Sequence, residues 1–565
     1  MNSSADTPTL PPSPSTLQGS VAGEWEALFG TRWPLVLLVG LVLVCAVGAA
    51  VPLADADLGM HLRVGEWIAE HGTLPRTEPF AWTRQGAPYF AYSWLAELLY
   101  FVLWRGAGAP ALQLLNGLLL LGAAVAAAVF ARCARHGAWT TVLLVAAHVM
   151  VVEYCAPALR PQQLLAVVLP LSWAATARLA TGRRAPWPYA LLGAATALAA
   201  NTHLFAPACA SALAFLLPAR GWRATRAEWV RFAGAAAAIG AGLVCTPYAP
   251  EWRAVYRLYF APTPLLRFPS PIAELIPGVV DLSRGFGAGW FVVPALALLP
   301  WIVRPGPDAP FSAAGAPAGR DGGGLTPGVM PSALLWLAGL LFFGLATRGL
   351  FLWWLVCLPL VAAALARLPE PSAGWVGRAL RAGPLVLCAQ LATSNLRSAI
   401  DARAGARSES PRRLPNSAAR GALWLADTLD RVAPRGRGRV VTTFDYGNAL
   451  VWRLPRYSMS LDGRAVFPDS ATALDVFVAA WRRPDTLRAP LANADLVVLP
   501  AGHVGLAQVA RTQGWTRVAR VGPVGGVRDT VQGDTAEVWA RTEWVRRYAG
   551  VGAQPAGGYA AARAP

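Results

Sequence analysis

The stretch VPLADADLGMHLRVGEWIAEH, residues 51–71, begins where a long apolar run ends. That run, residues 34–53, is long enough to cross a bilayer, which takes roughly 17 to 25 apolar residues. Within 57–71 the apolar residues recur at helical spacing, at Met60, Val64, Trp67 and Ile68. Charged residues occupy the opposite side, so we predict a short amphipathic helix lying on the membrane surface, too short and too charged to span it.

The composition of the whole chain supports a membrane class. Of 565 residues, 55% are hydrophobic and only 14% are charged, which is too apolar for a soluble protein of this size. All 49 basic residues are arginine, which excludes a phosphate-binding or catalytic lysine. The seven cysteines lie in or beside apolar segments without paired spacing, which favours neither a zinc site nor a disulfide framework.

The apolar runs predict a polytopic α-helical membrane protein with about 11 transmembrane helices. Runs of spanning length occur at 34–53, 110–131, 138–154, 162–181, 187–203, 228–246, 285–303, 331–347, 348–366 and 380–396, and a shorter eleventh at 204–218. With all eleven counted, the arginines of the short loops fall on one side, which is cytoplasmic by the positive-inside rule. The alternate loops and everything after about residue 397 then lie outside. The net charge of +18 is divided between the membrane loops and the C-terminal region, which is net basic, and we expect a lipid bilayer as partner and no nucleic acid.

Three regions follow from this topology. Residues 1–33 are rich in Pro and Ser and are predicted to be a disordered cytoplasmic tail. Residues 34–396 form the transmembrane domain, with a large outer loop at 54–109. Residues 397–565 are predicted to form a small, soluble, extracytoplasmic α/β domain.

The C-terminal region alternates strand-like and helix-like segments. Strands are expected at 438–444, 457–463, 495–500 and 516–522, and helices at 416–432, 470–483 and 503–514. Asp445 and Asp462 each follow a predicted strand, where binding groups are common in such sheets. A turn is an equally good explanation of both, because Asp, Asn and Gly are turn residues.

Two aspartates and a histidine stand at the start of the helix predicted in the outer loop. Asp55 and Asp57 fall where a carboxylate can cap the free backbone N–H groups, which explains one aspartate better than two. His61 follows Asp57 by four residues and therefore lies on the same face. An imidazole and a carboxylate so placed can share a proton or a metal ion.

The outer loop, DADLGMHLRVGEWIAEHGTLPRTEPFAWTRQGAPYFAYSWLAELLYFVL, resembles the first outer loop of bacterial multi-pass proteins of the GT-C glycosyltransferase superfamily. Further similarity to one bacterial branch lies in LRPQQ, ANTHLF, CTPYAPEW, AEL, ATRGLF, TTFDYGNALVWRL and SLDGRAVF. Members of the superfamily transfer sugar from a polyprenyl-phosphate carrier to an acceptor at the outer membrane face, and their first large loop carries an acidic D-x-D-like motif.

The resemblance implies roles for particular residues. Asp55 or Asp57 would be the general base for the acceptor hydroxyl, or would hold a divalent metal such as Mg or Mn. The donor phosphate would be bound by His61, Arg160, His203 and Arg348. The acceptor would lie near Asp445, Asp462 and Arg464. The alternatives are that the arginines extend to lipid headgroups and that His203 caps a helix end.

The sequence leaves three functions open. The first is a glycosyltransferase that uses a polyprenyl-phosphate-linked sugar as donor and a cell-envelope glycan, lipid or protein as acceptor. It would lie in a bacterial cytoplasmic membrane, with its N-terminus on the cytoplasmic side. The second is a transporter or flippase of lipid-linked glycans, which would need ionisable residues in mid-span and broken helices in an internal repeat. The third is a non-catalytic binding protein with the same fold, because the chain departs from the family pattern at Gly59, in NTHLF and in AEL.

Overall fold

A computed structural model of the chain describes residues 38–47, 57–155, 159–181, 185–217, 224–260, 349–366, 420–442, 444–460, 491–500, 511–521 and 536–549, with a few isolated positions between 337 and 396. Several predictions lie wholly or largely outside these residues: the tail 1–33, the spans 285–303, 331–347 and 380–396, and the helices 470–483 and 503–514.

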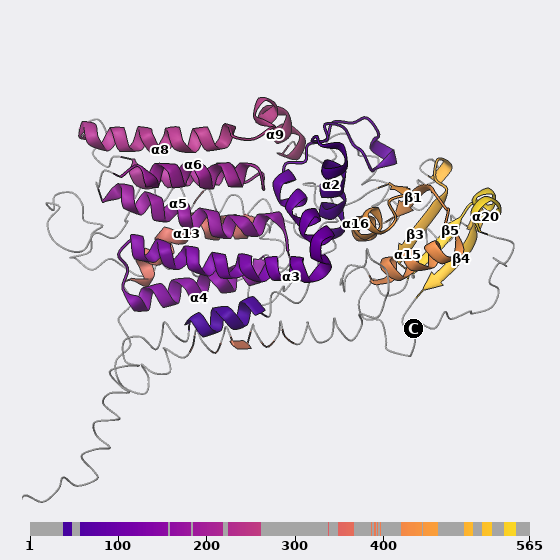
Figure 1. The fold of residues 1–565 in the computed structure, drawn as a ribbon, viewed down its shortest axis with the longest axis horizontal. Helices are drawn as coiled ribbons and strands as arrows, with labels where there is room; N and C mark the ends of the chain where they lie inside the picture. Colours follow the sequence, from indigo (N-terminus) through magenta and orange to yellow (C-terminus); the bar gives the residue numbers. More distant parts are fainter. Residues whose placement is uncertain are drawn as a thin grey trace, which may run out of the picture.

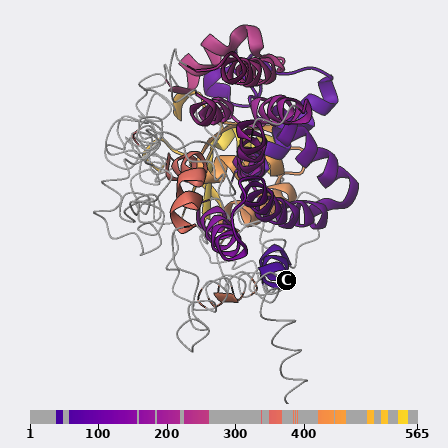
Figure 2. The same ribbon diagram turned by 90° about the vertical axis from the view of Figure 1, so that its left-hand side faces the viewer.

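Long apolar helices lie side by side in a bundle, seen from the side in Figure 1 and end-on in Figure 2. They are α3 (Trp94–Cys133), α4 (Ala138–Cys155), α5 (Leu165–Ala180), α6 (Trp187–Ala200), α8 (Arg226–Val244) and α13 (Gly349–Leu365). Within the described ranges, three helical stretches are long and apolar enough to cross a membrane: Trp94–Cys133, Pro161–Ala180 and Arg226–Val244. Leu38–Val47, Ala138–Glu153, Trp187–Ala200, Ala206–Leu216 and Leu350–Leu365 are apolar but shorter. The predicted number of about 11 spans stays a prediction.

The ends and breaks of these helices follow from local sequence. In α3, Gly108 has φ 64° and ψ −153° and is followed by Pro110, so the helix breaks just before the predicted span 110–131. At the start of α8, the Thr225 hydroxyl accepts from the Glu228 N–H at 3.3 Å, while Glu228 accepts from the Thr225 N–H at 2.7 Å. The predicted short span 204–218 forms only η3 (Ala206–Ala212) and α7 (Leu213–Leu216).

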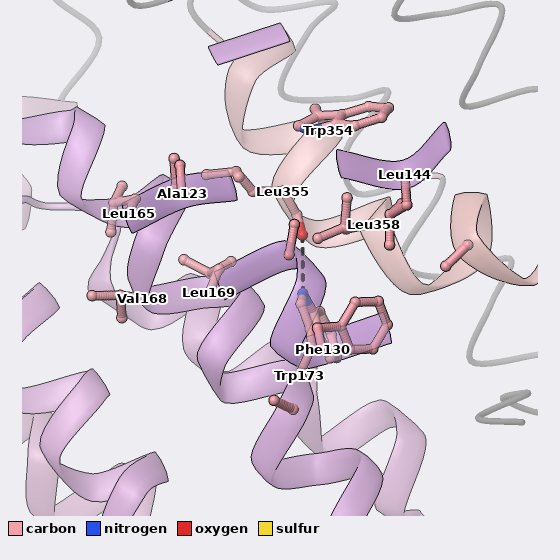
Figure 3. Packing of buried hydrophobic residues seen from close by; sticks show 14 of the residues in the cluster. Ala123, Phe130, Leu144, Leu165, Val168, Leu169, Trp173, Trp354, Leu355 and Leu358 are labelled. Atoms are coloured by element: carbon pink, nitrogen blue, oxygen red, sulfur yellow. Dashed lines mark hydrogen bonds between the residues drawn. The ribbon is translucent and has the colours of Figure 1, made fainter. Parts of the chain in front are cut away.

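Large aromatic side chains fill the centre of the bundle. In Figure 3 the Trp173 indole of α5 donates to the Leu355 carbonyl of α13 at 3.0 Å, beside Phe130 of α3. Trp354 donates to Nδ1 of the fully buried His148 at 2.9 Å. Because a buried indole N–H needs an acceptor, these bonds fix how α13 packs against its neighbours.

The C-terminal region contains a five-stranded sheet of order β2-β1-β3-β5-β4. The strands are β1 (Gly438–Thr442), β2 (Tyr457–Met459), β3 (Leu496–Pro500), β4 (Thr516–Val521) and β5 (Ala536–Ala540). β1 pairs in parallel with β2 and β3, whereas β5 is antiparallel to both β3 and β4. The accompanying helices are α15 (Arg420–Val432), α16 (Phe444–Arg453) and α20 (Thr542–Tyr548). The four predicted strands are present, while β5, α16 and α20 were not predicted.

Helix α2 (Leu58–His71) runs across the end of the bundle and lies between it and α16 (Figure 1). Its predicted apolar stripe is buried, but Met60, Val64 and Ile68 pack into the core of the C-terminal sheet and its helices. The prediction that this stripe faces the membrane is therefore wrong for these three residues, because the C-terminal region covers them. Gly65 of α2 lies against the backbone of Glu97 in α3, where the two helices cross.

Candidate active site

The Asp57 carboxylate lies at the start of α2 and does not cap the helix. Asp57 itself has helical φ and ψ, and its side chain makes no cap hydrogen bond. Instead, its Oδ1 accepts a hydrogen bond from the Asn448 amide at 2.6 Å, and its Oδ2 lies 3.4 Å from the Arg160 guanidinium. The capping explanation is thus wrong for Asp57, whose carboxylate is held by side chains from two other parts of the chain.

Three separate segments bring these groups together. Arg160 has extended backbone, with φ −127° and ψ 149°, and directly precedes η2 (Pro161–Leu164), where Pro161 fixes the turn into the helix. Asn448 is fully buried in α16. A guanidinium and an amide N–H both favour the ionised carboxylate. The side chains of Asp57 and Arg160 are 17% and 20% exposed, so this pair can be reached from outside the protein.

His61 is paired with a residue other than the predicted one. Its Nδ1 lies 3.0 Å from Oε1 of Glu97, and both side chains are buried. The prediction that His61 shares a proton or metal with Asp57 is therefore wrong for Nδ1, which faces α3. If Nδ1 carries a proton it donates to Glu97, and a protonated ring then presents Nε2–H as a second donor. Oε2 of Glu97 has no hydrogen-bond partner among the described atoms.

The structure places His203 beside the loop that precedes α3. Its ring stands edge-on to Tyr92, with centroids 6.0 Å apart, and its Nδ1 accepts from the Phe205 N–H at 3.2 Å. This bond lies directly before η3, whose first turn has no side-chain cap, so both the phosphate role and the capping role of His203 remain predictions.

Four of the five remaining predicted site residues lie outside the part of the chain that the structure describes. Asp55, Arg348, Asp462 and Arg464 lie outside the described residues. Asp445 lies in the first turn of α16 directly after β1, so the turn explanation is wrong at that position. The roles of all five residues remain predictions.

The metal site predicted at Asp55 and Asp57 stays a prediction, because Asp55 lies outside the described residues. Within the part of the chain that the structure describes, no group of three or more His, Cys, Asp or Glu side chains could hold one. Asp57 lies against the Arg160 guanidinium, with 3.4 Å between Oδ2 and the nearest guanidinium nitrogen. Metal dependence through Asp55 stays a prediction, and no step below requires a metal.

The outer loop is fastened to the C-terminal sheet and to the segment after α8. Thr83 in η1 (Trp82–Arg84) donates to the Ser460 carbonyl at 2.6 Å. Tyr248, just before η5 (Ala249–Glu251) and α9 (Trp252–Phe260), donates to the Pro75 carbonyl and accepts from the Ala91 N–H, each at 3.1 Å. Burial raises the pKa of Tyr248, so its hydroxyl keeps the proton that this bond needs. Hydrogen bonds therefore hold the outer loop in place at Pro75, Thr83 and Ala91.

Sequence reasoning missed Asn448 and Glu97. Asn448 belongs to the segment Asp-Tyr-Gly-Asn, for which a turn was one of two explanations, and it was not singled out as a site residue. The helical spacing of Tyr446, Ala449 and Leu450 was the available signal for α16. Glu97 is a single acidic residue inside the apolar run WLAELLYFVLW, which already marks it as a buried group in need of a partner.

Comparison with solved structures identifies the class of fold. The arabinofuranosyltransferase AftD from Mycobacteria matches 90% of this chain with a TM-score of 0.52 and 20% sequence identity. The match covers 40% of AftD, so this chain spans about two fifths of that protein. The oligosaccharyltransferase AglB from Archaeoglobus fulgidus, in complex with an inhibitory peptide and a dolichol-phosphate, matches 91% of this chain and 75% of its own, with a TM-score of 0.50 and 13% identity.

The apo form of the Archaeoglobus fulgidus oligosaccharyltransferase gives a TM-score of 0.51 at 14% identity, over 90% of this chain and 76% of its own. At these identities the matches show a shared fold, so the predicted resemblance is confirmed at the level of the fold. No protein-family model matches the chain, and no curated protein matches it.

Proposed function

We propose that the chain is an integral membrane glycosyltransferase that moves a sugar from a polyprenyl-phosphate donor to an acceptor in the cell envelope. The observation that carries the proposal is the Asp57 carboxylate, held between Arg160 and Asn448 and partly exposed at one end of a bundle with the GT-C fold. The names of the structural neighbours, an arabinofuranosyltransferase and an oligosaccharyltransferase, support sugar transfer. The dolichol-phosphate in the archaeal complex supports a lipid-phosphate donor.

In this mechanism Asp57 is the general base. The acceptor hydroxyl attacks the anomeric carbon of the sugar, its proton passes to the carboxylate, and the bond from that carbon to the lipid phosphate breaks. The lipid phosphate leaves as an anion, and the configuration at the anomeric carbon inverts. Asp57 is suited to this role because the Arg160 guanidinium and the Asn448 amide keep it ionised while its remaining lone pairs can accept a proton.

The leaving phosphate needs cationic or hydrogen-bonding groups. Arg160 is partly exposed beside Asp57, and its planar guanidinium has donors for both the carboxylate and a phosphate oxygen. His61 supplies a further donor from Nε2 when its ring is protonated, with Nδ1 held by Glu97. Arg348 and His203 remain additional candidates for the phosphate.

The reaction is placed on the extracytoplasmic face of a bacterial cytoplasmic membrane. The arginine distribution supports this orientation, because the outer loop, Arg160 and the C-terminal region share one predicted side. The acceptor would approach from the C-terminal domain, where Asp445, Asp462 and Arg464 are the candidate contacts.

A transfer assay with purified protein in nanodiscs tests the proposal. A small panel of polyprenyl-phosphate sugars is offered, and sugar transfer and donor hydrolysis are both measured. Asp57→Asn should lower kcat by about 100-fold or more, since general-base catalysis contributes on the order of 10² to 10⁴. Glu70→Gln is the matched control, because Glu70 is an exposed carboxylate on the same helix. An arm with EDTA, followed by added Mg or Mn, tests metal dependence.

Two results would contradict the proposal. Full activity of folded Asp57→Asn would remove the general base. Absence of turnover with every donor, in protein whose folding is verified, would favour the flippase or binding alternatives. Translocation of a labelled lipid-linked glycan in proteoliposomes then separates those two.

A further inference from the structure

Asn448 joins the C-terminal region directly to the candidate base. Its amide donates to Oδ1 of Asp57 at 2.6 Å, although the two residues are 391 positions apart in the chain. Asn448 is 0% exposed, so solvent cannot replace this donor. A hydrogen bond to an ionised group in a buried place contributes more than one at the surface.

Helix α16 is held on two sides, which fixes where the Asn448 amide points. On the side of the bundle, the Trp452 ring stands edge-on to Phe101 and Trp104, with centroids 6.4 and 5.9 Å away. On the side of the sheet, Arg453 makes ion pairs of 2.6 and 2.7 Å with Asp427 and Asp430 of α15. Rotation of α16 would break one set of contacts or the other. The amide is therefore preorganised and not a flexible surface group.

Asn448 and Arg160 approach different oxygens of the same carboxylate. Oδ1 faces the amide and Oδ2 faces the guanidinium, so the plane of the carboxylate is defined by two separate donors. A general base must hold its accepting lone pair within hydrogen-bond reach of the hydroxyl that it deprotonates. Small rotations of the carboxylate would take that lone pair out of line, which lowers the rate even if the substrates bind normally.

We propose that Asn448 is a positioning residue for the transfer reaction: the C-terminal region, through α16, orients the Asp57 carboxylate and keeps it ionised. The inference rests on the proposed function, in which Asp57 is the base. It assigns to the C-terminal region a part in the chemical step, in addition to any contact with the acceptor. A residue 391 positions from Asp57 in the chain would thus complete the active site.

The test compares three variants with the wild type in the nanodisc assay. Asn448→Leu removes the donor and keeps a similar size. Asn448→Asp is nearly isosteric and sets a second carboxylate against Asp57. Thr83→Ala is the matched control, because it removes another hydrogen bond between the outer loop and the C-terminal region, the 2.6 Å bond to the Ser460 carbonyl.

For Asn448→Leu we expect kcat to fall about 10- to 100-fold, the loss that removal of a hydrogen bond to a charged group produces. KM for the donor should stay within about twofold, because binding contacts are unchanged. The acid limb of the rate–pH profile should move to higher pH, since the ionised carboxylate has lost a donor. Asn448→Asp should be impaired most at neutral pH and recover in relative terms as the pH falls and one of the two carboxyls takes up a proton. Thr83→Ala should keep the kcat and the pH profile of the wild type.

The outcomes separate this inference from the function on which it rests. A wild type that transfers no sugar refutes the function. A wild type that depends on Asp57, together with an Asn448→Leu protein of normal melting temperature whose kcat and acid limb are unchanged, refutes the positioning role alone. If Asn448→Leu does not fold, the pH profile of Asn448→Asp decides: a profile parallel to that of the wild type also refutes the role.

Discussion

Gly65 lies where α2 crosses α3, and replacing it with alanine tests how closely the two helices must approach. A Cβ atom at this position would lie 2.1 Å from the Glu97 carbonyl oxygen, 2.7 Å from its carbonyl carbon and 2.8 Å from Cβ of Phe101. Two of these three atoms are backbone and cannot rotate away. Since unstrained contacts are about 3.5 Å or longer, the helices would have to separate by about 1 Å or more.

The size of the effect follows from two opposing terms. Overpacking against a rigid neighbour costs roughly 1–3 kcal/mol, and the upper part of that range fits a clash with backbone. Alanine in place of glycine inside a helix returns about 1 kcal/mol. We therefore expect Gly65→Ala to lower the free energy of unfolding by about 1–2 kcal/mol. Since α2 also carries Asp57 and His61, a shift of about 1 Å should reduce the transfer rate on the order of 100-fold.

The assay is thermal unfolding in nanodiscs, followed by tryptophan fluorescence, with the transfer rate measured on the same samples. Gly240→Ala in α8 is the matched control, because a Cβ there would meet nothing within 4 Å. It should leave stability unchanged or raise it by up to about 1 kcal/mol. Gly65→Ala protein that melts at or above the wild-type temperature and transfers sugar at the wild-type rate would refute the close crossing.

Three further predictions concern buried polar groups. Glu97→Ala leaves Nδ1 of His61 without its partner and should destabilise the protein by about 1–3 kcal/mol in thermal unfolding, more than Glu97→Gln does, and equal melting of the two variants would contradict this. Burial raises the pKa of Tyr457 from its ordinary value of 10.0 to about 12. The folded state thus keeps this proton to higher pH than the unfolded state, and the stability that it contributes is full below pH 10 and is lost as the pH rises toward 12. Tyr457→Phe should therefore flatten the alkaline fall in melting temperature, and an unchanged slope would count against the prediction. His148→Leu removes the acceptor of the Trp354 indole in the bundle and should cost about 1–3 kcal/mol, whereas a wild-type melting temperature would show that this bond is dispensable.

Local sequence patterns predicted several elements close to their observed bounds. The stretch from 57 to 71 has the spacing of an amphipathic helix, and α2 spans Leu58–His71. The span predicted at 110–131 begins just after Gly108, where α3 breaks. Short apolar segments rich in β-branched residues predicted β1 to β4. These features depend on residues within a few positions of one another, so periodicity and backbone preference suffice to find them.

Elements whose local signals conflicted were missed. The first turn of α16 contains Asp-Tyr-Gly-Asn directly after Phe444, and these residue types favour a turn. Packing between α2 and α15 makes the segment a helix instead. β5 (Ala536–Ala540) is completed by antiparallel pairing on both sides, with β3 and β4. In both places tertiary contacts outweigh a weak local preference.

The sequence by itself determined the membrane class, the helix that carries Asp57 and His61, and the choice of these two residues and Arg160 as candidates. Only the tertiary structure decided their partners. Glu97, 36 positions away in the chain, forms a hydrogen bond with Nδ1 of His61. Asn448, 391 positions away, donates a hydrogen bond to Asp57. The physical reason is that a carboxylate or imidazole on a helix end has several satisfactory partners nearby in sequence. Which partner it meets depends on how whole helices pack, and that is set by the buried surfaces of α2, α3 and α16 and not by the spacing of residues along the chain.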